Sequence, residues 1–366
     1  MILVAYRHPS RNDKRLERPS ELWKKWAYGF AIWQAIVTPV LAKTAASVID
    51  AHVHLAALPD GQNGCLMSNK IKNGIVFRYL AWRLGLPMDY PAEANRLYID
   101  RLVLALKASQ DVRQAVILGM DGVYDSQGEL DRANTDFLIS NDYVFSVVDQ
   151  HPDLFKAGVS INPQRRDAVA ELERCAKKGA VLVKILPNAQ QFNPANPAYV
   201  PFYRAMARLH IALLCHVGYE YALIGKDQTL GDPRNLQLAL DQGVTVIAAH
   251  AMSNGLFFRE PYWDTLVRFV RKYPQFYWDA SAMSLPNRIG MLLRIRRHPE
   301  LARRMIYGTD YPMPEFAIPA LLVGDWRGYR DLWKMPNPFD RHFRLLEIMG
   351  FPHPRGMEKI IFGAAK

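Results

Sequence analysis

Short apolar segments recur along the chain from residue 47 onward, and segments with helical periodicity separate them. Eight of these apolar segments are rich in Val, Ile and Ala: residues 48–55, 114–120, 155–162, 180–187, 211–218, 244–250, 275–280 and 305–310. Segments this apolar are typical of strands that are buried on both faces. The hydrophobic pattern therefore predicts eight buried strands.

The intervals between these segments predict helices at residues 95–109, 130–146, 163–178, 199–210, 235–242, 261–272, 287–297 and 341–349. Gly179 and Gly243 directly follow two of the predicted helices, where glycine is the usual C-terminal cap. Strands that alternate with helices pair in parallel. Eight such units predict a closed (β/α)8 barrel, the TIM-barrel architecture, over residues 47–366.

Residues 1–46 form a distinct N-terminal extension to this barrel. Residues 26–42 carry no charge and are mostly apolar, and a basic segment precedes them. A basic flank before an apolar segment is typical of a signal peptide or a membrane anchor. The alternative is a helix that packs against the barrel, so the location stays open between the cytoplasm and membrane association or export.

Two insertions interrupt the regular alternation. Residues 56–94 form a long loop after the first predicted strand, and residues 314–338 delay the last helix. Loops that follow barrel strands rise over the C-terminal face, where active sites are built. We therefore expect residues 56–94 to form a lid or a wall of the site, with a purely structural loop on the rim as the alternative.

The composition narrows the classes of function. The formal net charge is +11, but the basic residues are dispersed and form no recognisable nucleic-acid module. The three cysteines lie far apart, which argues against a disulfide framework and a cysteine zinc site. No glycine-rich nucleotide loop is present. A small molecule is thus the expected partner, without nucleic acid, and association with copies of the same chain remains open.

Polar residues interrupt the apolar segments mainly near their C-terminal ends. The first segment carries His52 and His54, and strand geometry predicts that both point to one face, with Asp50 behind them. Later segments carry four further polar residues: Lys184, His216, His250 and Asp310. Burying a lone charged or imidazole group in an apolar strand costs free energy unless the group has a partner. Because the strand ends of a barrel converge, the six residues predict a common site.

This set of residues resembles the amidohydrolase superfamily, and in its details the amidohydrolase-related branch that includes aminocarboxymuconate semialdehyde decarboxylase-like proteins. The resemblance covers residues 47–352 and includes all eight predicted strands. It implies a (β/α)8 barrel with a divalent metal ion at the C-terminal ends of its strands.

The resemblance also implies roles for individual residues. The expected metal ligands are His52, His54, His216 and Asp310, which suit Zn²⁺, with one ion favoured and two as the alternative. Asp310 and His250 are the expected catalytic residues. Lys184 either binds the substrate unmodified or, carboxylated, bridges two metal ions. Asn188 and Tyr219 follow the strands of Lys184 and His216 and are candidates for the pocket.

The activity implied by the resemblance is that of a metal-dependent hydrolase. Water activated by the metal would attack an ester, lactone, amide or related carbon centre. A non-oxidative, metal-dependent decarboxylase of a small carboxylic acid would use the same ligands and is the first alternative. A barrel that binds a ligand without turnover is the second.

Overall fold

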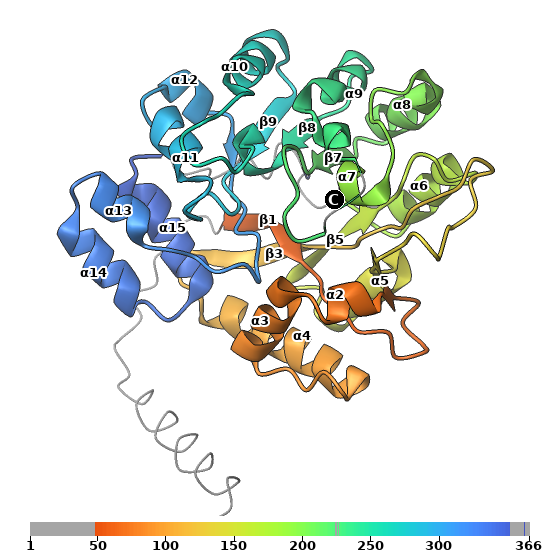
Figure 1. The fold of residues 1–366 in the computed structure, drawn as a ribbon, viewed down its shortest axis with the longest axis horizontal. Helices are drawn as coiled ribbons and strands as arrows, with labels where there is room; N and C mark the ends of the chain where they lie inside the picture. Colours follow the sequence, from red (N-terminus) through yellow and green to blue (C-terminus); the bar gives the residue numbers. More distant parts are fainter. Residues whose placement is uncertain (1–47, 224, 226, 352–361, 363–366) are drawn as a thin grey trace, which may run out of the picture. The chain divides into compact units, whose positions relative to one another are not determined.

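The computed structural model describes residues 48–223, 225, 227–351 and 362. Within these residues, parallel strands form an eight-stranded sheet, and Figure 1 shows the helices arranged around it. The strands are β1 (Val48–His54), β3 (Val112–Leu118), β5 (Phe155–Ser160), β6 (Leu182–Ile185), β7 (Ala212–Cys215), β8 (Val246–Ala248), β9 (Phe276–Asp279) and β10 (Met305–Ile306). Each overlaps one predicted apolar segment, and they neighbour one another in chain order.

Hydrogen bonds between the first and last strand regions close the sheet. The amide of Ala51 donates to the carbonyl of Tyr307 at 2.9 Å, and the amide of His54 donates to the carbonyl of Tyr311 at 2.8 Å. In return, the amide of Asp310 donates to the carbonyl of His52 at 2.9 Å. The predicted (β/α)8 barrel is confirmed, and its closure places β1 directly beside Asp310.

Most of the predicted helices are present, although their ends differ by several residues. The longer helices are α4 (Pro91–Ala108), α5 (Asn141–Gln150), α6 (Ala168–Lys177), α8 (Val200–Arg208), α10 (Trp263–Lys272), α11 (Ile289–Ile295) and α15 (Pro338–Ile348). Shorter ones are α7 (Pro187–Gln190), α9 (Gln237–Asp241) and α12 (Pro299–Ala302). The predicted caps Gly179 and Gly243 have φ angles of +88° and +83°, a conformation that glycine adopts without a steric penalty.

The predicted helix over residues 130–146 is wrong in its first half. Residues Phe137–Leu138 form the short strand β4, which pairs antiparallel with β2 (Leu66–Met67) from the insertion after β1. The helix begins only at Asn141, where the side chain of Ser140 accepts a hydrogen bond from the amide of Tyr143 at 3.1 Å. Pairing with a segment distant in sequence thus overrides the local helical pattern.

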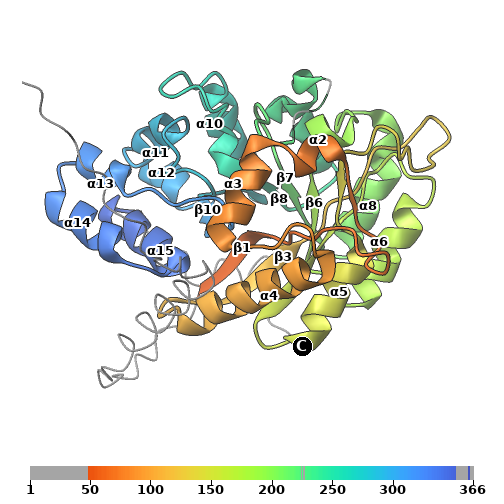
Figure 2. The same cartoon turned by 60° about the horizontal axis from the view of Figure 1, so that its bottom comes forward.

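The two insertions contain more regular structure than the sequence pattern indicates. Residues 56–94 include β2, α2 (Asn69–Lys72) and α3 (Ile75–Leu84), and Figure 2 shows α3 above α4. The second insertion contains α13 (Ile318–Leu322) and α14 (Trp326–Lys334). The insertion after β1 is therefore a segment with its own strand and helices rather than a simple loop.

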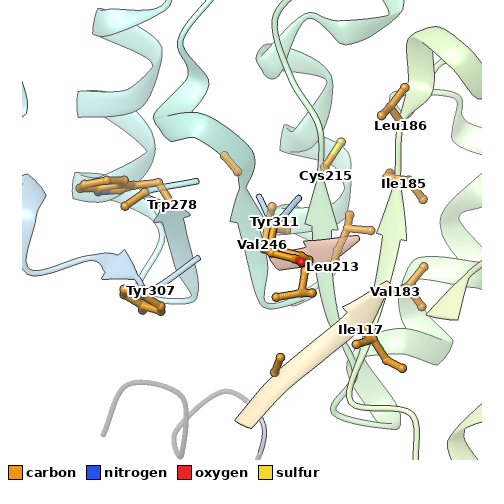
Figure 3. Packing of buried hydrophobic residues seen from close by; sticks show 14 of the residues in the cluster. Ile117, Val183, Ile185, Leu186, Leu213, Cys215, Val246, Trp278, Tyr307 and Tyr311 are labelled. Atoms are coloured by element: carbon orange, nitrogen blue, oxygen red, sulfur yellow. The ribbon is translucent and has the colours of Figure 1, made fainter. Parts of the chain in front are cut away.

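Two apolar clusters flank the strands. The inner cluster fills the barrel and includes Val116, Leu118, Leu182, Leu214 and Ile247. The outer cluster lies between the strands and the helices, and Figure 3 shows some of its members, among them Ile117, Val183, Leu213 and Val246. Adjacent residues on one strand belong to different clusters, as strand geometry requires.

The first strand departs from strict alternation at the site itself. In the pairing of β1 with β3, Asp50 is opposite Ala115 and Val53 is opposite Ile117, so β1 carries one extra residue. Such a bulge re-aims the side chains that follow it. Asp50 accordingly accepts hydrogen bonds from the amide and the hydroxyl of Thr309, at 3.1 and 2.6 Å. The prediction that Asp50 stands behind His52 and His54 on one face is wrong.

The predicted N-terminal extension, residues 1–46, lies outside the described residues, together with its apolar segment at residues 26–42. Within the part of the chain that the structure describes, none of the helices has the length and apolarity needed to cross a membrane.

The interior of the barrel leaves no space for a larger residue at Gly158 of β5. A Cβ atom there would lie 2.6 Å from Leu118 Cδ2 and 2.9 Å from Val116 Cγ1, both buried. We expect Gly158→Ala to lower the free energy of unfolding by about 1–3 kcal/mol through overpacking, measured by urea denaturation. Leu104→Ala, on the exposed side of α4, is the control and should change stability little. An unchanged Gly158→Ala protein would contradict this account of the interior.

Candidate active site

The barrel brings three of the predicted ligands into one group. His54 Nε2 lies 3.0 Å from Asp310 Oδ1, and His52 Nε2 lies 3.2 Å from the same oxygen. All three ligand atoms lie within 4.8 Å of one another. His52 and His54 come from the end of β1, and Asp310 follows β10, so closure of the barrel creates the group.

This group has the chemistry and spacing of a divalent metal site. Ligands at 2.0–2.1 Å from a tetrahedral ion lie about 3.3 Å from one another, close to the observed separations. Two imidazoles and one carboxylate are donors that Zn²⁺ and related ions accept. His52, His54 and Asp310 could therefore hold a divalent metal ion.

His216 is near this group but does not belong to it. Its Nδ1 lies 3.3 Å from His250 Nε2, and its Nε2 lies 3.3 Å from Glu220 Oε2. The ring of His250 in turn stacks on the ring of His52, with centroids 5.5 Å apart. His216 and His250 thus form a second pair of imidazoles beside the first.

Lys184, the only predicted site residue on β6, points into the barrel toward the first pair. Its Nζ lies 3.0 Å from His52 Nε2, and the side chain is buried. Burial lowers the pKa of Lys184, although the charges of Asp279 and Asp310 partly oppose this shift. The amine therefore loses its proton more readily than that of an exposed lysine.

Asp279 is a central site residue that the sequence analysis missed. Its Oδ2 lies 2.7 Å from His52 Nδ1, and its Oδ1 accepts from the backbone amide of His250 at 2.8 Å. The hydroxyl of Ser281 also donates to this carboxylate. A carboxylate on the far nitrogen of an imidazole fixes the tautomer and orientation of a metal ligand. Asp279 ends an apolar strand as Asp310 does, so the same sequence rule would have found it.

The electrostatics of the site favour metal binding. Burial lowers the pKa of His216 to about 4, and burial likewise lowers the pKa values of His52 and His250. Burial by itself would raise the pKa of Asp310, but the imidazoles of His52, His54 and His250 outweigh it and hold that pKa well below its usual range. At neutral pH the site therefore contains free imidazole lone pairs beside an ionised carboxylate, which are the forms that bind metal.

Two of the site residues have an unusual backbone conformation. His250 and Asp310 have φ angles of +54° and +68°. Residues other than glycine are strained in this left-handed region, and such strain clusters at functional sites. The contact from Asp279 to the amide of His250 and the bond from the amide of Asp310 to the carbonyl of His52 hold the two turns in place.

A cavity of about 400 Å³ opens above these residues. His54, Lys184, His216, His250 and Asp310 line its polar part. The insertion after β1 supplies an apolar wall through Ile71, Ile75, Val76, Phe77 and Leu80. Residues of the segment 56–94 thus line this cavity, as predicted for a wall over the C-terminal ends of the strands.

Asn188 and Tyr219, the two predicted pocket residues, lie outside the lining of this cavity. The amide of Asn188 donates to the carbonyl of Gly218 at 3.2 Å and to Gln228 Oε1 at 2.8 Å, so it links loops behind the site. Tyr219 packs on Tyr221, with ring centroids 4.7 Å apart, and Tyr221 is the one that lines the cavity. Side-chain direction in the loops, which the sequence pattern does not contain, decides both positions.

The fold and the site together define a (β/α)8 barrel with histidine and carboxylate donors at the C-terminal ends of its strands. The sequence model of the amidohydrolase family matches residues 49–332, and the chain belongs to this family. The resemblance drawn from the residues at the strand ends is thereby confirmed. None of the curated proteins compared with the chain matches it.

Solved structures share the fold at low sequence identity. An uncharacterized TIM-barrel protein from Bordetella bronchiseptica is 19% identical, with a TM-score of 0.54 over 83% of this chain and 99% of that one. A probable 2-pyrone-4,6-dicarboxylic acid hydrolase from Acinetobacter baumannii is 15% identical (TM-score 0.48; 83% and 100% covered). The 5-carboxyvanillate decarboxylase of Sphingomonas paucimobilis is 13% identical (TM-score 0.45; 84% and 100% covered). The first of these likenesses supports the barrel fold.

We expect Asp279→Asn to weaken divalent-metal binding about 10- to 100-fold, because the amide no longer fixes the orientation and basicity of His52. Titration of the chelator-treated protein with Zn²⁺ measures the effect. Asp264→Asn changes an exposed carboxylate in the first turn of α10 and is the control. Equal zinc affinity in the two variants would show that Asp279 does not support the ligand.

Proposed function

We propose that this protein is a metal-dependent hydrolase that acts on an ester, lactone, amide or related carbon centre. The observation that carries the proposal is the convergence of His52, His54 and Asp310 on one point, beside a cavity that His54 and Asp310 line and that is large enough for a small molecule. Membership of the amidohydrolase family supports the same class of chemistry.

In this proposal His52, His54 and Asp310 hold a divalent ion, with Zn²⁺ favoured, and His216 completes the ligand set from the end of β7. A bound ion would supply Lewis acidity that makes water more acidic and polarises a substrate oxygen. Asp279 keeps the Nδ1 proton on His52, so that Nε2 offers its lone pair toward the cavity.

Asp310 and His250 are the proposed proton carriers. The depressed pKa of Asp310 makes it a weak base, so it suits a proton acceptor only for water that is already acidified. The Nδ1 of His250 lies 2.9 Å from the carbonyl of Ser281, which can only accept. His250 Nε2 therefore holds the lone pair and serves as the second candidate for accepting a proton.

The number of ions depends on Lys184. We favour one ion and an unmodified Lys184 that meets the substrate, because the side chain of Lys184 lines the cavity. The alternative is a carboxylated Lys184 that bridges two ions. The pair formed by His216 Nδ1 and His250 Nε2, 3.3 Å apart, would then supply donors for the second ion.

A decarboxylase is the second candidate, and one observation favours it. Two buried cationic side chains, Lys184 and Arg288, border a cavity whose remaining wall is largely apolar. Such surroundings attract a carboxylate and exclude water from it. Following CO₂ release and the incorporation of ¹⁸O from labelled water, over panels of esters, lactones and carboxylic acids, separates the two. CO₂ release without ¹⁸O in the product would replace the hydrolase by the decarboxylase.

We expect purified protein to contain about one divalent ion per chain by elemental analysis, and His52→Ala and His54→Ala each to lose most of it. A site that has lost one ligand binds its ion far more weakly, while the barrel keeps its fold by circular dichroism. His151→Ala, which precedes β5 at the opposite end of the barrel, is the control and should keep its metal. A content of two ions per chain would support the carboxylated Lys184. Protein without any bound metal would contradict the proposal.

We expect Asp310→Asn to lower kcat about 10²- to 10⁴-fold, the range common for loss of a general base, with a smaller change in KM. The amide keeps the shape of the side chain but cannot accept a proton. Turnover is measured on the best substrate of the panels, in protein shown to retain its metal. Asp89→Asn, exposed before α4, is the control. Full kcat in metal-loaded Asp310→Asn would move the role of base to His250.

A further inference from the structure

Arg288 is a buried cation that forms no ion pair with any of the described residues. It lies at the N-terminal end of α11, lines the active-site cavity and is only 5% exposed. Its Nη1 donates to the carbonyl of Ser253 at 2.7 Å, and this is the one hydrogen bond of the side chain among the described residues. Within those residues, no carboxylate oxygen lies within 4.0 Å of the guanidinium. A guanidinium carries five N–H donors, so most of its capacity is unused.

This arrangement is unusual, because buried arginines are nearly always paired with acidic groups. Burial lowers the pKa of Arg288, and the more distant charges of Glu220 and Asp310 oppose that shift. An arginine remains protonated in proteins under ordinary conditions. The cavity therefore contains a positive charge that no side chain of the described residues neutralises by direct contact.

The other two cations of the cavity differ from Arg288. Lys70 is on the rim, is largely exposed and pairs with Asp136 at 2.7 Å. Lys184 lies deep in the barrel, with its amine 3.0 Å from His52 Nε2. Its amine therefore lies beside the proposed metal ligands. Arg288 is the cation of the cavity wall that combines burial with unused donors.

The surroundings hold Arg288 in place without neutralising it. Its acceptor is the backbone carbonyl of Ser253, and the hydroxyl of Ser253 donates to Glu260 Oε1 at 2.8 Å. A Cβ atom on Gly218 would lie 2.6 Å from the same carbonyl, so the loop after β7 packs against it. A planar donor group fixed in this way is preorganised to bind a carboxylate through two parallel hydrogen bonds.

We propose that Arg288 binds a carboxylate of the substrate, and that the substrate's apolar body lies against the wall formed by the insertion after β1. The inference rests on the proposed function, since it assigns a substrate class to the same cavity. The apolar wall, which includes Phe77 and Leu80 of α3, complements an aryl or alkyl group and not a second charge. The substrate class is thus an apolar monocarboxylate whose anion is bound apart from the metal ligands.

Binding of matched probes to the full-length protein tests this assignment. Isothermal titration calorimetry compares ω-phenylalkanoates of two to five carbons with the corresponding primary amides, which keep the shape and lose the charge. We expect the best carboxylate to bind at least about 10-fold more tightly than its amide, in line with a charge-assisted bidentate contact. In Arg288→Met this preference should disappear while the affinity for the amide stays the same.

Lys70→Met removes the paired rim cation and is the matched control, which should keep the preference. Equal affinity of the wild-type protein for acid and amide, no binding by the whole series, or a preference that survives in Arg288→Met would overturn the assignment. If Arg288→Met fails to fold by circular dichroism, the comparison of acid and amide in the wild-type protein still decides it, together with Arg288→Lys, which should weaken the preference.

Repeating the titrations after chelation separates this inference from the proposed function. A preference for the acid that persists without metal supports Arg288 as the anion site. A preference that disappears when the metal is removed would show that the carboxylate of the probe binds to the ion, and it would overturn the inference. Absence of metal from the purified protein would defeat the proposed function alone, because the acid and amide comparison does not depend on it.

Discussion

The site depends on one buried carboxylate, that of Asp279 at the end of β9. One of its oxygens lies against His52 Nδ1 from β1, and the other accepts from the amide of His250, which follows β8 in a strained turn. A single side chain thus fixes the orientation of the His52 ring, a proposed ligand, and the backbone conformation of His250, a proposed proton carrier. Its own charge is stable in the interior because the imidazoles around it, above all His52, hold its pKa well below the usual range despite burial. Without this carboxylate the imidazoles would keep their places on the strands but not their orientation.

The barrel and its loops contribute differently to the cavity. Strand ends carry the proposed metal donors, and their separations follow from parallel pairing and from the closure of β10 onto β1. The insertion after β1 and the segments after β7 and β9 carry the apolar wall and Arg288. The rigid strands thus fix the positions of the proposed catalytic groups, where errors of an ångström matter. The loops determine which molecule fits into the cavity. The proposed substrate class is based on three features of the cavity: a polar floor, an apolar wall, and a guanidinium without a carboxylate partner in the described part of the chain.

Much of this could be predicted because the burial of strands leaves a strong periodic signal. All eight strands were located, and His52, His54, Lys184, His216, His250 and Asp310 were recognised as costly polar groups at strand ends. Asp279 obeyed the same rule and was overlooked. Other features carried no comparable signal. The bulge that turns Asp50 toward Thr309 and the pairing of β4 with β2 each depend on a segment distant in sequence.

The sequence by itself determined the architecture and the inventory of donors, because hydrophobic periodicity and the cost of burying polar groups are local properties of the chain. The tertiary structure decided which donors meet. It placed His54 Nε2 and His52 Nε2 around one oxygen of Asp310, paired His216 with His250, and left Asn188 and Tyr219 outside the cavity. It also left Arg288 buried without a carboxylate partner among the described residues. Such outcomes depend on side-chain directions and on contacts between distant segments, which a periodic pattern along one chain does not encode.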